Sequence, residues 1–158
     1  MGMLDKISRI VIGSERATAR DAVTVLTDTY TAAMQRSRDL AQHAELAPQP
    51  ASADALRELA AAEEAQAARL REALRTAGVD TRATPEAPVS GGSNHWARLV
   101  ADLEAHRASM RGARERAVHF AETVPSTAAL FDQLSREEAL HCERLRALIA
   151  RADPQALD

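Results

Sequence analysis

The sequence is poor in the residues that stabilise small secreted domains and β-sheets. It contains one cysteine, Cys142, so no disulfide can form within the chain. Aromatic residues make up only 3% of its 158 residues. The apolar residues, 46% of the total, are mainly alanine and leucine, which favour helices over strands. The composition therefore indicates one helical domain with a core of small side chains and leucine.

Long apolar runs and an excess of positive charge are also missing. No stretch is apolar for long enough to cross a bilayer. The first fourteen residues, MGMLDKISRIVIGS, are interrupted by charged residues and do not resemble a secretion signal. The net charge is −3, which gives no summed positive field to hold a polyanion. We therefore expect no nucleic-acid partner, no membrane span and, with a single cysteine, a cytoplasmic location.

Helix-breaking segments divide the chain into four long helices. The expected boundaries are Ser14 or Thr18 to about Glu45, Ser52 or Asp54 to Gly78, Ser93 or Asn94 to just before Pro125, and Ser126 to about Ala152. The links within each half are short, whereas the polar connector 79–93 is long enough to cross a bundle. The sequence predicts an all-α, antiparallel four-helix bundle, 15–153, made of hairpins 15–78 and 94–153.

Each expected helix has an apolar stripe whose members alternate three and four residues apart. In the second helix this stripe contains Glu63 and Gln66, and in the fourth it contains Glu138 and His141. The two polar pairs are separated by a constant offset of 75 residues, and the same offset aligns their flanking leucines and arginines. The second hairpin therefore looks like a duplicate of the first, with both polar pairs facing the middle of the bundle.

Two motifs carry a resemblance to a known family. LAAAEEAQAARL, residues 59–70, and LSREEALHCERL, residues 134–145, resemble the ferritin-like superfamily and, within it, the rubrerythrin-like branch. The resemblance implies two hairpins joined by a long crossover and a di-iron site with a Glu-x-x-His pair on the second and fourth helices. It assigns metal-ligand roles to Glu63, Glu138 and His141, and it also implies a glutamate from each of the first and third helices.

The sequence departs from that ligand set in two ways. Gln66 stands where the family has its other histidine, and an amide is a poor replacement for imidazole at iron, manganese or zinc. When the helices are levelled across their tight turns, no carboxylate of the first or third helix faces inward; the inward residues there include Tyr30 and His106. The sequence therefore predicts an incomplete di-metal site.

Two interpretations of this polar layer remain open. In the first, Glu63, Glu138, His141 and His106 hold Fe, Mn or Zn, with Gln66 and Tyr30 supporting them by hydrogen bonds. These six residues would then belong to a metal-binding oxidoreductase or iron-handling protein that oxidises Fe(II) or removes oxygen or peroxide.

In the second interpretation the layer binds no cofactor. A protonated His141 pairs with Glu63 or Glu138, and Gln66 bridges the remainder, which fixes the register of the helices. The missing carboxylates favour this interpretation. It describes a bundle without catalytic residues that acts as a homo-oligomer or by binding a protein partner.

Residues outside the polar layer lead to two further expectations. Segment 1–14 carries an apolar stripe that is suited to docking on the bundle, on a second subunit or on a partner. His43, His95 and His119 lie off the apolar stripes and are expected at the surface.

Overall fold

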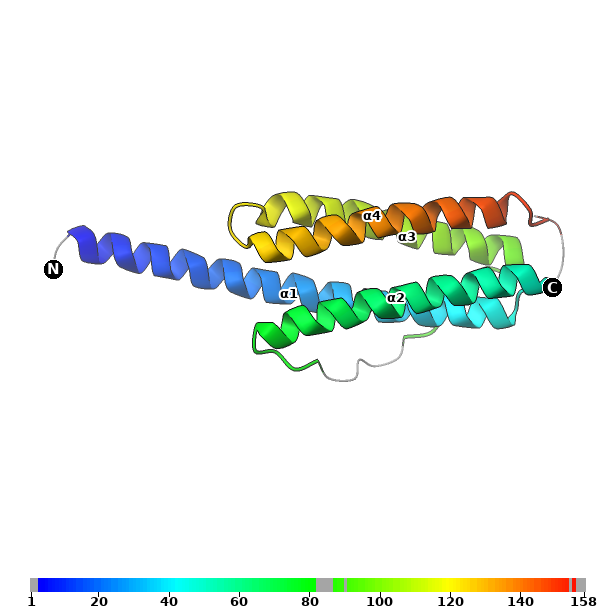
Figure 1. The fold of residues 1–158 in the computed structure, drawn as a ribbon, viewed down its shortest axis with the longest axis horizontal. Coiled ribbons are helices and arrows are strands. Elements are labelled where there is room, and N and C mark those ends of the chain that lie inside the picture. The colour runs from blue at the N-terminus through cyan, green and yellow to red at the C-terminus, as the bar shows by residue number, and fades with distance from the viewer. Residues whose placement is uncertain (1–2, 82–86, 90, 154, 156–158) are drawn as a thin grey trace.

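The computed structural model describes residues 3–81, 87–89, 91–153 and 155, with side chains from residue 17 onward. Within these residues the chain forms four helices, shown in Figure 1: α1 Met3–Glu45, α2 Pro50–Thr76, α3 His95–Phe120 and α4 Pro125–Ile149. Helices α1 and α2 pack as one antiparallel hairpin and α3 and α4 as another, while α1 faces α3 and α2 faces α4 between the hairpins. The predicted all-α bundle of two hairpins is confirmed.

The connector between the hairpins joins opposite ends of the bundle. Helix α2 ends at Thr76, which lines the same groove as Val124 in the α3–α4 turn. Helix α3 begins at His95, and Arg98 in its first turn donates a hydrogen bond to the carbonyl oxygen of Leu46, beside the α1–α2 turn. The predicted long crossover is therefore present, and α2 and α3 run in the same direction.

Local capping chemistry explains where the helices begin and end. The Asn94 side chain accepts a hydrogen bond from the backbone N–H of Ala97, at 2.9 Å, and starts α3 as predicted. At the end of α2, Gly78 has φ +78°, a conformation that glycine adopts without strain. The N–H of Val79 bonds the carbonyl of Leu74 at 2.9 Å, which completes a Schellman motif.

Two predicted helix starts are wrong by a few residues. Helix α2 begins at Pro50 rather than Ser52 or Asp54, and α4 begins at Pro125 rather than Ser126. The reason is that proline suits the first helical position, where its missing N–H leaves no bond unmade.

Helix α1 differs most from the prediction. It runs without a break from Met3 through Gly13, so the expected start at Ser14 or Thr18 is wrong. One internal glycine costs only about 1 kcal/mol of helix stability, and no proline interrupts this stretch. Helix α1 has 43 residues against 27 in α2, and its N-terminal part projects past the end of the bundle (Figure 1). The side chains of 1–14 lie outside the described part, so their docking role stays a prediction.

The core consists of two apolar clusters with a polar layer between them. One cluster contains Leu26, Leu70, Phe120 and Phe131, and the other is built from leucines nearer the α1–α2 turn. The polar layer occupies the helix turns between these clusters, as the stripes predicted. Within the described residues, no helix combines the length and the apolar character that a transmembrane span needs.

Candidate metal centre

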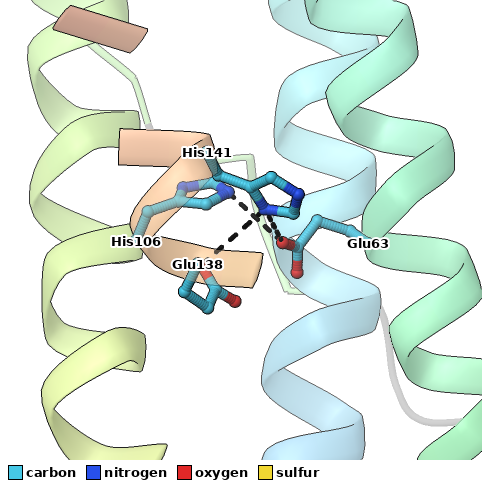
Figure 2. A group of neighbouring side chains, drawn as sticks. All are labelled: Glu63, His106, Glu138 and His141. Carbon is cyan, nitrogen blue, oxygen red and sulfur yellow. Dashed lines mark hydrogen bonds and ion pairs between the residues drawn. The ribbon is translucent and has the colours of Figure 1, made fainter. Parts of the chain in front are cut away.

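Four side chains from three helices converge in the polar layer, as Figure 2 shows. Glu63 comes from α2, His106 from α3, and Glu138 and His141 from α4, where a spacing of three residues places both on one face. One ligand atom of each residue lies within 4.8 Å of the others, and all four residues are buried. The structure thus brings together the four residues that the sequence singled out.

Both imidazoles face the same carboxylate oxygen. His106 Nδ1 donates a hydrogen bond to the backbone carbonyl of Asp102, at 2.8 Å, which directs Nε2 inward to 3.3 Å from Glu63 Oε1. His141 Nδ1 lies 3.1 Å from that oxygen and 3.9 Å from Glu138 Oε2. A histidine tethered through one nitrogen and free to bind through the other is typical of metal sites.

Two residues that the sequence did not assign to the layer hold its carboxylates from the other side. Arg36 of α1 donates from Nε to Glu63 Oε2 at 2.9 Å and from Nη2 to Glu138 Oε1 at 3.0 Å. Ser109 of α3 donates from Oγ to the same Glu138 oxygen at 3.0 Å. An arginine of α1 and a serine of α3 thus contact these two glutamates, and the incomplete di-metal site stays a prediction.

The electrostatic environment separates the two glutamates. Burial by itself would raise the pKa of Glu63, but the imidazoles of His106 and His141 and the charge of Arg36 outweigh it and hold that pKa well below its usual range. Burial, the main cause, raises the pKa of Glu138, and the charge of Glu63 raises it further, so that the opposing charges of Arg36 and the histidines do not cancel the rise. Glu63 is therefore firmly ionised, whereas Glu138 lacks enough positive charge around it.

Two ligand atoms of the cluster have no hydrogen-bond partner within the described residues. They are Glu138 Oε2 and His106 Nε2, both fully buried; the imidazole nitrogen lies 3.3 Å from Glu63 Oε1, within ion-pair distance but without hydrogen-bond geometry. Buried polar atoms are nearly always paired, so each such atom needs an explanation. A cation beside them would supply it, and two imidazole nitrogens with two carboxylates are a donor set that suits Fe, Mn or Zn. The residues present therefore fit a divalent transition-metal ion.

The two residues predicted to support the ligands have different surroundings. Gln66 is 2% exposed and lies one turn after Glu63 on α2. The hydroxyl of Tyr30 accepts a hydrogen bond from Arg71 Nη2 at 2.8 Å. Across the described residues no hydrogen bond joins Tyr30 to the four ligand candidates, so its supporting role stays a prediction.

The surface positions predicted for two other histidines are wrong. His43 and His95 are buried, at 1% and 7% exposure, and only His119 is exposed as expected. His43 Nδ1 donates to Asp102 Oδ2 at 2.8 Å, so a partner on another helix satisfies it inside the core. Because the Asp102 carbonyl also holds His106, this second buried pair adjoins the candidate metal centre.

A half-open cleft leads from the surface to the layer between α1 and α3. Its volume is about 410 Å³, and small residues leave it open. Its lining includes Ala32, Arg36, Ala105, Ala108, Ser109 and Gly112. Since Arg36 and Ser109 both bond to Glu138, the cleft reaches the outer side of the cluster.

The fold is that of a ferritin-like four-helix bundle, and it holds a buried group of two glutamates and two histidines. Among solved structures the chain is similar to Dps from Thermosynechococcus elongatus, with 17% identity and a TM-score of 0.76 over 90% of this chain and 99% of that one. It is also similar to a Rhodobacter capsulatus bacterioferritin with a metal-free dinuclear site and haem iron, with 19% identity and a TM-score of 0.75 over 86% and 89%.

A third similar structure is a dodecameric thioferritin from Bacteroides fragilis, with 12% identity and a TM-score of 0.75 over 84% and 86% of the two chains. The sequence matches no family model and no curated protein. At these identities the likeness shows the fold alone. The ferritin-like architecture is thus confirmed, and the rubrerythrin-like branch stays a prediction.

Proposed function

We propose that the protein binds one divalent transition-metal ion through Glu63, His106, Glu138 and His141. The observation that supports this best is the convergence of four buried ligand atoms, two of which have no hydrogen-bond partner within the described residues. A layer that only fixed helix register would be expected to satisfy its own polar atoms. The geometry therefore favours the metal-binding interpretation over the cofactor-free one.

The chain's own residues divide the work of such a site. Glu63 supplies a permanent negative charge, and the Asp102 carbonyl holds His106 with Nε2 facing inward. The apolar clusters on both sides keep bulk water away, which strengthens the attraction between carboxylates and a cation. Bound iron or manganese would supply one-electron redox chemistry, whereas zinc would supply Lewis acidity alone.

Iron handling is the activity that we propose for this site. The similar bacterioferritin has a dinuclear site and haem iron, which makes Fe(II) the first ion to test. The expected reaction is oxidation of Fe(II) to Fe(III), with dioxygen or peroxide accepting the electrons, and a rubrerythrin-like activity would favour peroxide.

Metal content tests the proposal directly. The protein is purified without chelator, assayed for Fe, Mn and Zn, and then titrated with Fe(II) without oxygen. We expect one equivalent per chain, and Glu138→Ala should lose it. Glu143→Ala is the matched control, because this exposed glutamate lies on the same helix. A folded wild-type protein that binds no ion would contradict the proposal.

A second candidate function, self-association, rests on a separate feature. An apolar groove of about 360 Å³ lies at the end of the bundle from which α1 projects, lined in part by Val23, Leu26, Ala73 and Leu130. The B. fragilis thioferritin is dodecameric, and we propose that this chain also forms a homo-oligomer, through this groove. Light scattering should show Val23→Glu as a smaller species, while Val118→Glu, at an exposed site outside the groove, keeps the native mass.

A further inference from the structure

We infer that the Arg36 guanidinium occupies the place of a second metal ion and limits the cluster to one ion. The inference rests on the proposed function, because it concerns how many ions the same two glutamates hold. The observation that supports it is that Arg36 bonds one carboxylate oxygen of Glu63 and one of Glu138.

Each glutamate presents one oxygen to Arg36 and the other to the histidines. Glu63 Oε2 and Glu138 Oε1 accept the two guanidinium bonds, at 2.9 and 3.0 Å. Glu63 Oε1 faces both imidazoles, and Glu138 Oε2 lies 3.9 Å from His141 Nδ1. The two carboxylates therefore border two places for a cation, one holding the guanidinium and the other surrounded by ligand atoms.

Arg36 and Ser109 both contact the glutamates of the cluster, one from each hairpin. Arg36 on α1 bonds the glutamate of α2, and Ser109 on α3 bonds the glutamate of α4. A complete di-metal set would take one carboxylate from each of the two helices that carry Arg36 and Ser109. Because an arginine and a serine contact the two glutamates, a second ion gains no carboxylate from these two residues and meets a fixed positive charge, since arginine stays protonated.

The Arg36 side chain is also firmly held and in the right place to exclude an ion. It is 11% exposed and bonds two carboxylates that are 0% exposed. Arg36 and Ser109 both line the cleft between α1 and α3, so the outer cation place lies beside this cleft. Replacing them with glutamate would open that place to an ion and supply two new ligands.

Ion stoichiometry tests this inference. The metal-free wild type and the double variant Arg36→Glu, Ser109→Glu are titrated with Mn(II), and bound ions are counted by elemental analysis. We expect one equivalent in the wild type and two in the variant, with the electron paramagnetic resonance signal changing from an isolated to an exchange-coupled ion. Arg36→Lys keeps the positive charge and should stay at one equivalent. Arg107→Glu, at an exposed position on α3, is the control for the change in net charge and should also stay at one.

The outcomes separate this inference from the proposed function. One equivalent in the folded double variant, or two in the wild type, would overturn the role of Arg36 and leave metal binding intact. No ion in the wild type and two in the variant would overturn the proposed function and support the role of Arg36. Should the double variant fail to fold, Arg36→Gln replaces it as the test, since it removes the charge without adding a ligand. A second ion bound with millimolar affinity would support the inference. A single equivalent would overturn it.

Discussion

The protein buries histidine and carboxylate side chains in two neighbouring regions that differ in how completely they are paired. In one region His43 and Asp102 form a hydrogen bond of 2.8 Å between α1 and α3. In the other, the four residues of the metal-centre cluster converge with Arg36, yet His106 Nε2 and Glu138 Oε2 have no hydrogen-bond partner within the described residues. The first region is a hydrogen-bonded pair, and the second has two buried ligand atoms without a hydrogen bond among the described residues.

Space differs between the two regions as well. A Cβ added at Gly91 would lie 3.1 Å from His43 Nε2, so the backbone closes over the outer face of that imidazole. The metal-centre cluster instead adjoins the cleft that Arg36 and Ser109 line. Buried histidines and carboxylates are thus no evidence of a metal site by themselves. Unpaired ligand atoms together with a route from solvent are the features that distinguish the cluster.

The largest effect is expected at Asp102, which takes part in both regions. Asp102→Ala removes the carboxylate of the buried pair and should lower the free energy of unfolding by about 4 kcal/mol, because it leaves His43 without its partner. Metal stoichiometry should not change, since alanine keeps the backbone carbonyl that holds His106. Urea denaturation and metal analysis of the same sample measure the two effects.

A double variant sharpens this prediction. Replacing both members of the pair, His43→Leu with Asp102→Leu, should cost less stability than Asp102→Ala alone, because the imidazole that loses its carboxylate is removed as well. If Asp102→Ala also lost its metal ion, the His43–Asp102 pair and the metal-centre cluster would not be separate units.

The next largest effect is expected at Glu63, on metal affinity. Its Oε1 faces both imidazoles and its Oε2 holds Arg36, so Glu63→Gln removes the charge around which the cluster is arranged. If four ligands share a binding free energy of about 10–16 kcal/mol, losing one costs roughly 3 kcal/mol, or about 100-fold in Kd. Calorimetric titration with Zn(II) measures it. Glu64→Gln, the exposed neighbour, should bind like the wild type, and equal affinity in both variants would refute the assignment.

The four helices and their pairing could be predicted from the sequence because both depend on patterns that are local along the chain. Apolar stripes identify the buried face of each helix, and prolines, glycines and Asn94 mark the helix ends. Glu63, Glu138, His141 and His106 could be predicted for the same reason, since each occupies an inward position of a stripe. Their use as metal ligands stays a proposal.

The remaining features of the site depend on contacts between distant helices. Arg36 lies beside the stripe of α1, and only the reach of its long side chain brings the guanidinium into the layer. His43 was expected at the surface because it lies off the apolar stripe, and its partner, Asp102, is 59 residues further along the chain. An apolar stripe predicts which face of the helix each Cβ atom lies on. It does not predict where the end of a long side chain lies or which residue it contacts.

A smaller effect is expected at Ser109, which supports Glu138 without being a ligand candidate. Ser109→Ala removes the hydrogen bond to Glu138 Oε1 and should weaken metal binding by about 10-fold, the lower end of the range for groups that orient ligands. Competition with a chromogenic chelator resolves a change of this size. Ser135→Ala, which loses a hydrogen bond to the Met110 carbonyl away from the ligands, should leave the affinity unchanged. Equal weakening in both variants would mean that Ser109 acts only through packing.

The smallest effect is expected at Gly91, and it tests whether the His43 region is closed. In Gly91→Ala the new methyl group would lie 3.1 Å from His43 Nε2 and 3.5 Å from Arg98 Cγ, so the neighbours must shift. We expect a loss of less than about 1 kcal/mol in unfolding free energy, because reduced backbone freedom in the unfolded chain offsets part of the strain. Gly112→Ala is the control: its nearest neighbour is 3.7 Å away and it lies within α3, so it should gain about 0.5–1 kcal/mol. An equal gain at both positions, measured by thermal unfolding, would show that the backbone does not close over His43 and would remove one of the two differences between the regions.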